Sequence, residues 1–76
     1  MTPDREIDAI GLLCPLPVLR ARKALLAMAP GQVLAVLASD PAAVIDMPHF
    51  CNESGHLLLD SAETAPGIRR YLIQRG

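Results

Sequence analysis

Residues 11–20 read GLLCPLPVLR and place a cysteine directly before two prolines and a helical pattern. Proline is favoured in the first turn of a helix, because its fixed φ is helical and the N–H that it lacks would have no partner there. Pro15 and Pro17 therefore predict a helix that begins at Pro15, with Cys14 at its N-cap. Free N–H groups and the positive end of the helix dipole would then point at the Cys14 sulfur. This arrangement predicts a thiol pKa below the ordinary value of about 8.5.

The residues after Cys14 have the spacing of an amphipathic helix. Apolar side chains recur at intervals of three and four residues, at Val18, Ala21, Leu25 and Met28. Arg20 and Lys23 fall on the opposite side, and Arg22 falls near the boundary. The pattern predicts an amphipathic helix of about 15 residues from Pro15 to Ala29, which Pro30-Gly31 ends.

Strand patterns flank this helix on both sides. After a loose start over residues 1–5, residues 6–10 alternate between apolar and charged side chains and predict a short first strand. Residues 32–39 form a continuous apolar run, which is typical of a strand in the middle of a sheet. Strand, helix and strand in this order predict a right-handed crossover that joins two parallel strands.

The second half of the chain contains two signals for the start of a helix, Asp40-Pro41 and Met47-Pro48. One continuous helix would hold Pro48 in its interior, at a cost of about 3 kcal/mol or more. We therefore expect a short helical turn after Pro41 and a separate helix from Pro48 to about Ser54. Gly55 suits the residue after that helix, where a positive φ is needed.

Two more strands complete the predicted fold. Residues 56–62 and 68–75 are apolar runs separated by a turn at residues 65–67, which predicts an antiparallel hairpin. The order is then βαβαββ, an α+β two-layer sandwich with two helices packed on one face of a four-stranded mixed sheet. Residues 1–76 are expected to form a single domain.

Composition restricts the function. A net charge of −1 argues against non-specific binding of nucleic acid. No signal-peptide pattern or long apolar run is present, so we expect a cytoplasmic protein without membrane contact. Residues 9–39 contain no carboxylate but hold three basic residues, Arg20, Arg22 and Lys23. The first helix is therefore either a solvated face or a docking surface for an acidic partner.

Cys14 is the main candidate for chemistry. A cysteine hydrolase needs a base within reach, and a chain of 76 residues with His49 and His56 as its histidines has little room for a substrate cleft. The cysteine spacing is not that of a zinc site, so no metal is expected. An accessible thiolate can still exchange sulfur without a pocket or a cofactor, so sulfur relay is favoured over hydrolysis.

Three alternatives remain open at this point. Cys51 follows Phe50 and is interpreted as a small buried hydrophobe, or else as a resolving thiol that pairs with Cys14 in a redox switch. Asp46 either caps the helix that follows it or borders the Cys14 site. A third alternative is a non-catalytic regulatory or interaction module that docks through its basic first helix.

These motifs resemble those of the TusA (SirA-like) family of small sulfur-carrier proteins, over the range Asp8–Arg75. The Cys-Pro-x-Pro box at residues 14–17, with residues 8–13 before it, carries the resemblance together with a second box at residues 46–51. Smaller matches lie at residues 22–25, at Gly31 and at Asp40-Pro41. Leu16 departs from the family pattern, in which a polar or acidic residue is common at this position.

The resemblance implies the same βαβαββ fold and a persulfide relay rather than an enzyme with ordinary turnover. Cys14 would accept sulfane sulfur from a cysteine desulfurase and pass it to an acceptor protein, without a cofactor of its own. The destinations implied are tRNA thiolation, molybdenum-cofactor biosynthesis and dissimilatory sulfur oxidation, with no direct contact to nucleic acid expected. Pro15, Pro17 and Asp46 would support the site. A partner-binding surface would comprise Arg20, Arg22 and Lys23.

Overall fold

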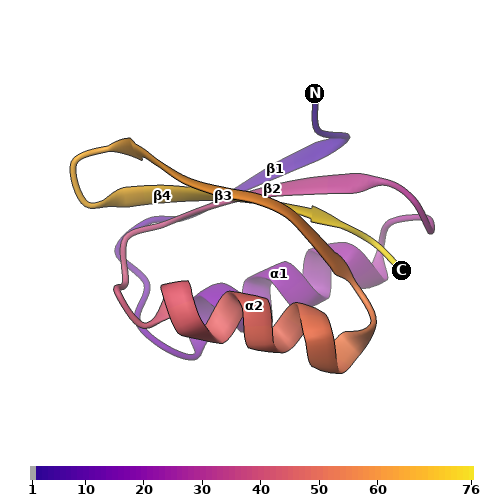
Figure 1. The fold of residues 1–76 in the computed structure, drawn as a ribbon, viewed down its shortest axis with the longest axis horizontal. Coiled ribbons are helices and arrows are strands. Elements are labelled where there is room, and N and C mark those ends of the chain that lie inside the picture. Colours follow the sequence, from indigo (N-terminus) through magenta and orange to yellow (C-terminus); the bar gives the residue numbers. More distant parts are fainter. Residues whose placement is uncertain (1) are drawn as a thin grey trace.

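A computed structural model describes residues 2–76 as six elements in the order βαβαββ. The elements are β1 (Arg5–Ala9), α1 (Leu16–Leu26), β2 (Val33–Ala38), α2 (Ala43–Ser54), β3 (Leu57–Ala65) and β4 (Ile68–Gln74). The strands form one sheet in the order β1-β2-β4-β3, in which β1 is parallel to β2 and the other two pairings are antiparallel. Both helices cover the same face of this sheet (Figure 1). The predicted α+β two-layer fold is confirmed.

The hydrophobic core lies between the helices and the sheet. Its largest fully buried side chains are Tyr71, Leu25, Leu34, Met47, Ile73 and Val36. Helix α1 contributes most of the predicted stripe, with Ala21 and Leu25 buried and Val18 half-buried, and Met28, just after the helix, is also buried. As predicted, the apolar face of α1 packs the helix against the sheet. Within residues 2–76, neither helix has the length and apolar character needed to cross a membrane.

The segment before β1 is held in place, although the sequence predicted a loose start. The Asp4 N–H donates to the Val33 carbonyl at 2.8 Å, and the Val33 N–H donates to Asp4 Oδ2 at 2.7 Å. These bonds lead directly into the pairing of Arg5 with Leu34. The side chain of Asp4 thus extends the sheet by one residue. Residue 1, which the prediction included, lies outside the described residues.

Helix α1 is shorter at both ends than the predicted range Pro15–Ala29. Pro15 is the N-cap, with φ −98° and ψ 15°, so Leu16 is the first helical residue. At the other end the N–H groups of Ala27 and Met28 donate to carbonyls three residues earlier, which tightens and ends the last turn. The prediction that Cys14 is the N-cap was wrong by one residue.

Helix α2 is continuous through Pro48, so the predicted break into two helices was wrong. Ala43, Met47, Phe50 and Cys51 are all buried and follow a spacing of four, seven and eight residues, which places them on one face. Burying a Met or Phe side chain stabilises a fold by about 1.5–3 kcal/mol, so Met47 and Phe50 together outweigh the cost of an interior proline. Gly55, with φ +75°, ends the helix as predicted.

Candidate functional site

Cys14 lies in the loop between β1 and α1, at the end of the sheet where both parallel strands finish and both helices begin (Figure 1). Two hydrogen bonds join this loop to the loop between β2 and α2. The Gly11 N–H donates to Ser39 Oγ at 2.8 Å, and the Cys14 N–H donates to Asp40 Oδ2 at 2.6 Å. Gly11 has a φ of +83°, which turns the chain out of β1. The sheet therefore fixes the backbone at Cys14.

Asp40 connects the cysteine loop to the start of α2. Its Oδ2 accepts the Cys14 N–H, while its Oδ1 accepts the N–H of Ala42 at 3.2 Å. From the sequence, Asp40-Pro41 was interpreted only as a helix-start signal, and its contact with Cys14 was not predicted. The Asp-Pro pair is the one signal that points to this residue, because an aspartate before a helix commonly bonds a backbone N–H.

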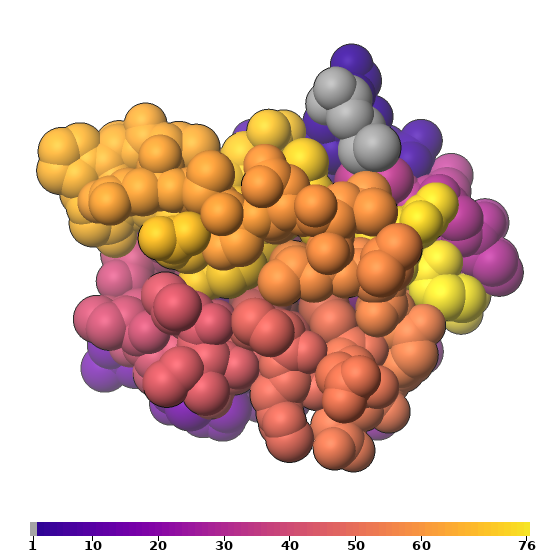
Figure 2. Space-filling model, viewed as in Figure 1, coloured from indigo at the N-terminus to yellow at the C-terminus, as the bar shows by residue number. Residues whose placement is uncertain are grey.

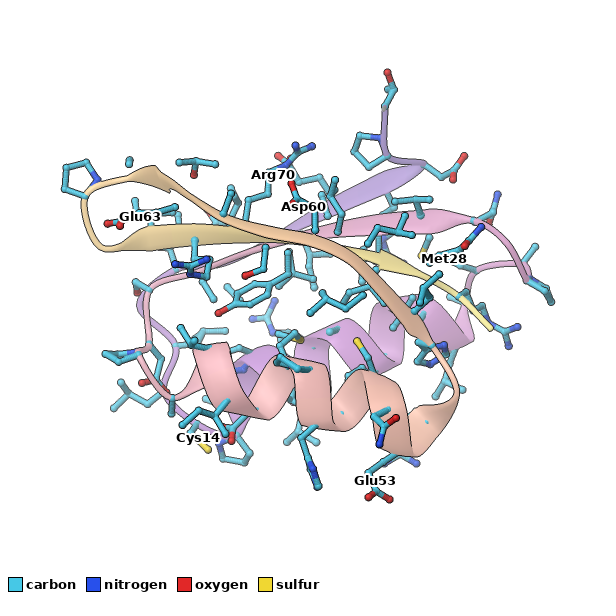
Figure 3. All side chains as sticks on the ribbon, viewed as in Figure 1. Cys14, Met28, Glu53, Asp60, Glu63 and Arg70 are labelled. Atoms are coloured by element: carbon cyan, nitrogen blue, oxygen red, sulfur yellow. The ribbon has the colours of Figure 1, made fainter. Side chains whose placement is uncertain are left out.

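Asp46 lies in the first turn of α2 and its carboxylate contacts the cysteine directly. The Cys14 thiol donates a hydrogen bond to Asp46 Oδ2, with 3.0 Å between sulfur and oxygen. Of the two alternatives for Asp46, the structure shows the one in which the side chain borders Cys14. Figure 3 shows Cys14 at the surface, next to the first turn of α2.

The pKa of the exposed Cys14 thiol is raised above its ordinary value, so the predicted lowering was wrong. The main cause is the hydrogen bond to Asp46, followed by desolvation and by the negative charges of Asp46 and Asp40. The start of α1 supplies little to oppose them, because Pro15 and Pro17 have no N–H. The N–H of Leu16 already donates to the carbonyl of Leu13 at 2.8 Å. At neutral pH the thiol is held in its protonated form.

An open groove of about 340 Å³ runs from Cys14 between the two helices. Its lining is Cys14, Pro15, Val18, Asp46, His49, Phe50 and Glu53. Glu53 lies near the far end of α2 from Cys14 (Figure 3), and its Oε1 is 3.9 Å from Nε2 of His49. Pro15 and Asp46 thus come together at Cys14, whereas Pro17 is buried beneath the first turn of α1. The groove presents mostly apolar surface next to the sulfur.

Large apolar side chains are exposed in the cysteine loop and near the starts of both helices. They are Ile10, Leu13, Leu16, Leu19, Val44 and Ile45, and this set is called the apolar rim below. Leu13 is 69% exposed and Ile45 is 76% exposed, and a gathering of such side chains in one region is typical of an interaction surface. This set was not predicted from the sequence, although Leu16 and Leu19 fall outside the apolar stripe predicted for α1.

The predicted basic surface of α1 is exposed as a whole. Arg20, Arg22 and Lys23 all lie on the solvent side of the helix. In Figure 2, α2 and the β3–β4 hairpin form the facing surface, and the segment leading into α1 emerges beneath the start of α2. A second, smaller hollow of about 190 Å³ lies between the β2–α2 loop and that hairpin, with Tyr71 and Arg69 among its lining.

Cys51 has the opposite environment to Cys14. Its side chain is 2% exposed within the core, and burial raises its pKa to about 11. Such a thiol remains protonated and inaccessible at neutral pH, as expected for the small buried hydrophobe. His49 is exposed, and His56 packs against Phe50 with ring centroids 5.7 Å apart. Among residues 2–76 no three His, Cys, Asp or Glu side chains are grouped so as to hold a metal.

Comparison with known proteins agrees with this geometry. A family model described as sulfurtransferase TusA matches residues 5–75. The sulfur carrier protein TusA of Allochromatium vinosum is 49% identical over 72 residues, a match that covers 95% of this chain and 93% of that protein. The crystal structure of a SirA-like protein from Desulfitobacterium hafniense matches with a TM-score of 0.84 at 30% identity, covering 95% and 97% of the two chains. The chain therefore belongs to the TusA family.

Proposed function

We propose that this protein is a sulfur carrier that holds sulfane sulfur as a persulfide on Cys14. It takes the sulfur from a cysteine desulfurase and passes it to an acceptor protein. The observation that carries the proposal is the environment of Cys14, a surface thiol fixed by two aspartates at the mouth of a groove, while the other cysteine of the chain is buried. Membership of the TusA family supports the same function.

Loading is a sulfur transfer between two cysteines. Cys14 Sγ forms a bond to the terminal sulfur of the donor's persulfide, and the sulfur–sulfur bond of the donor breaks. The thiol proton, which lies on the hydrogen bond to Asp46, ends on the departing thiolate of the donor. The thiol must lose its proton to react, and Asp46 is the group positioned to receive it first. No cofactor of the carrier takes part in this step.

Unloading needs a second partner with its own nucleophilic thiol. The proposed destinations are tRNA thiolation, molybdenum-cofactor biosynthesis or another route of sulfur trafficking in the cytoplasm. The carrier itself needs no contact with nucleic acid, because the acceptor protein performs the final transfer. Apolar side chains beside the thiol and basic side chains along α1 suit successive docking to a donor and an acceptor with acidic surfaces.

Radiolabelled cysteine tests this function directly. The carrier is incubated with a cysteine desulfurase and radiolabelled cysteine, and the proteins are separated without reducing agent. We expect label on wild type and on Cys51→Ala, none on Cys14→Ser, and complete loss of label after reduction. Label on Cys14→Ser would contradict the proposal, and equal label on wild type and Cys51→Ala would also contradict a required Cys14–Cys51 disulfide.

A further inference from the structure

Asp46 contacts one particular sulfur atom of the loaded carrier. Its Oδ2 lies 3.0 Å from Cys14 Sγ, which becomes the inner sulfur of the persulfide. The terminal sulfur takes the place of the thiol proton and, being anionic or larger than hydrogen, cannot stay on the carboxylate. It therefore turns away from Asp46, which forms one edge of the groove, toward the apolar part of the groove lined by Val18 and Phe50.

A thiolate can attack either sulfur, and the two reactions have different products. Attack on the terminal sulfur transfers it: a new persulfide forms on the attacking thiol, the sulfur–sulfur bond breaks, and Cys14 leaves as a thiolate that takes up a proton. Attack on Sγ releases the terminal sulfur instead: a mixed disulfide forms between the attacking thiol and Cys14, the same bond breaks, and hydrosulfide leaves. Only the first reaction delivers sulfur to an acceptor.

The position of Asp46 favours the first reaction. Exchange at sulfur proceeds in line with the bond that breaks, so a thiolate attacks Sγ from the side opposite the terminal sulfur. With the terminal sulfur turned away from it, Asp46 Oδ2, 3.0 Å from Sγ, obstructs part of the approach to Sγ and carries the same charge as the attacking group. The terminal sulfur is approached from the open side. When Cys14 departs and takes up a proton, its hydrogen bond to Asp46 forms again.

We propose that Asp46 determines which sulfur of the Cys14 persulfide is attacked, by shielding the inner sulfur so that the carrier transfers sulfane sulfur instead of releasing hydrosulfide. This inference deepens the proposed carrier function and rests on it. Asp46 touches the reacting atom, and its role is selectivity between two reactions rather than the rate of one.

The mass of the protein product reports which sulfur was attacked. Wild type, Asp46→Asn and Asp46→Ala are loaded with inorganic polysulfide, desalted, treated briefly with a small thiol, quenched with acid and measured by intact-protein mass spectrometry. Free Cys14 marks attack on the terminal sulfur, and a mixed disulfide marks attack on Sγ. Asparagine keeps a hydrogen-bond acceptor but removes the charge, which should raise the ratio of mixed disulfide to free thiol about fivefold. Alanine also removes the carboxylate-sized side chain beside Sγ and should raise this ratio further.

Two controls separate shielding from a general change in the protein. Glu53→Gln removes a carboxylate from the same groove, seven residues farther along α2, and should leave the ratio unchanged. Mercaptoacetate carries a second negative charge as a thiolate, whereas cysteamine carries a positive amine. The Asp46→Asn effect should therefore be larger with mercaptoacetate than with cysteamine, which a loss of folding would not produce.

The outcomes distinguish this inference from the carrier function itself. The same ratio in wild type, Asp46→Asn and Asp46→Ala would overturn the role of Asp46, while loading by a desulfurase would still support the carrier. A shifted ratio in polysulfide-loaded protein that no desulfurase loads would support the shielding and contradict the proposed donor. A wild-type Cys14 that neither polysulfide nor a desulfurase loads would overturn both.

Discussion

Solvent exposure makes the Cys14 thiol accessible, whereas the electrostatics of its surroundings disfavour the reactive thiolate. The side chain is open to solvent, yet the hydrogen bond to Asp46 and the charges of Asp46 and Asp40 raise its pKa. A sulfur carrier benefits from both properties, since the empty thiol is accessible to a partner but reacts slowly with oxidants and other electrophiles.

The pKa of Cys14 can be tested by alkylation. We predict that Asp46→Asn lowers this pKa, so that iodoacetamide modifies Cys14 several-fold faster than in wild type at pH 8. The advantage should shrink as the pH rises past the wild-type pKa, where both proteins hold a thiolate. Rates measured by mass spectrometry from pH 6 to 11 check this, and Glu53→Gln serves as the control. Equal rates at every pH would show that Asp46 does not hold the proton.

Cys51 makes the folded state less stable as the pH becomes alkaline. Its folded-state pKa of about 11 lies above the unfolded value, so its contribution to stability is complete below about pH 8.5 and is lost as the pH rises toward 11. We predict that Cys51→Ala unfolds more easily than wild type at pH 7 in urea. The difference in free energy of unfolding should fall by up to about 2 kcal/mol by pH 11. Tyr71 also has a raised pKa, from burial, but is present in both proteins. A difference that stays constant with pH would contradict the burial of this thiol.

At the scale of elements, Pro48 disfavours a continuous helix locally, whereas tertiary packing of α2 favours one. Its ring removes one hydrogen bond from the middle of α2, yet the helix continues because the residues on either side supply buried contacts. The interruption is tolerated on the exposed side of the helix, where Pro48 lies. Asp46 lies two residues before the proline, and its side chain contacts Cys14.

Pro48→Ala should therefore stabilise the protein. Alanine restores an N–H that can donate to the carbonyl of Val44, and it removes the clash between ring and backbone. We predict an increase of roughly 1–3 kcal/mol in the free energy of unfolding, measured with urea at pH 7. A decrease would mean that the helix depends on the proline to set its start, as the two-helix prediction assumed.

Elements whose patterns are complete in the local sequence were predicted well. Helix α1, the apolar run of β2, the hairpin and the positive φ of Gly55 need only nearby residues to be recognised. The N-cap position, the continuity of α2 and the ordered Asp4 depend on contacts between distant segments. Likewise the sequence identified Cys14 and Asp46 but not the sign of the pKa shift, which depends on a side-chain hydrogen bond across the two helices.

At the scale of the whole molecule, the surface around Cys14 combines apolar and basic residues. The apolar rim lies in the cysteine loop and near the starts of both helices, and the basic residues continue along α1. Apolar contact supplies affinity in a protein interface, while charge complementarity mainly increases the rate of association. The surface therefore suits a brief but specific encounter with an acidic partner.

Reversing the basic surface should weaken docking without changing Cys14. For Arg20→Glu with Lys23→Glu, we predict that transfer from the desulfurase is at least tenfold slower at low salt, and that the defect diminishes as salt is added. Loading by inorganic polysulfide should be unaffected. Arg5→Glu, in β1 at the end of the strand away from Cys14, is the control for a charge reversal outside α1. Transfer rates for the double variant equal to those of the control would exclude α1 as the docking surface.

Intact-protein mass spectrometry after incubation with a cysteine desulfurase and free cysteine tests the central claim most directly. Wild type and Cys51→Ala are predicted to gain the mass of one sulfur atom, which reduction removes, whereas Cys14→Ser is predicted to gain nothing. A gain that persists in Cys14→Ser, or that disappears in Cys51→Ala while that variant remains folded, would contradict the assignment of Cys14 as the sulfur-carrying residue.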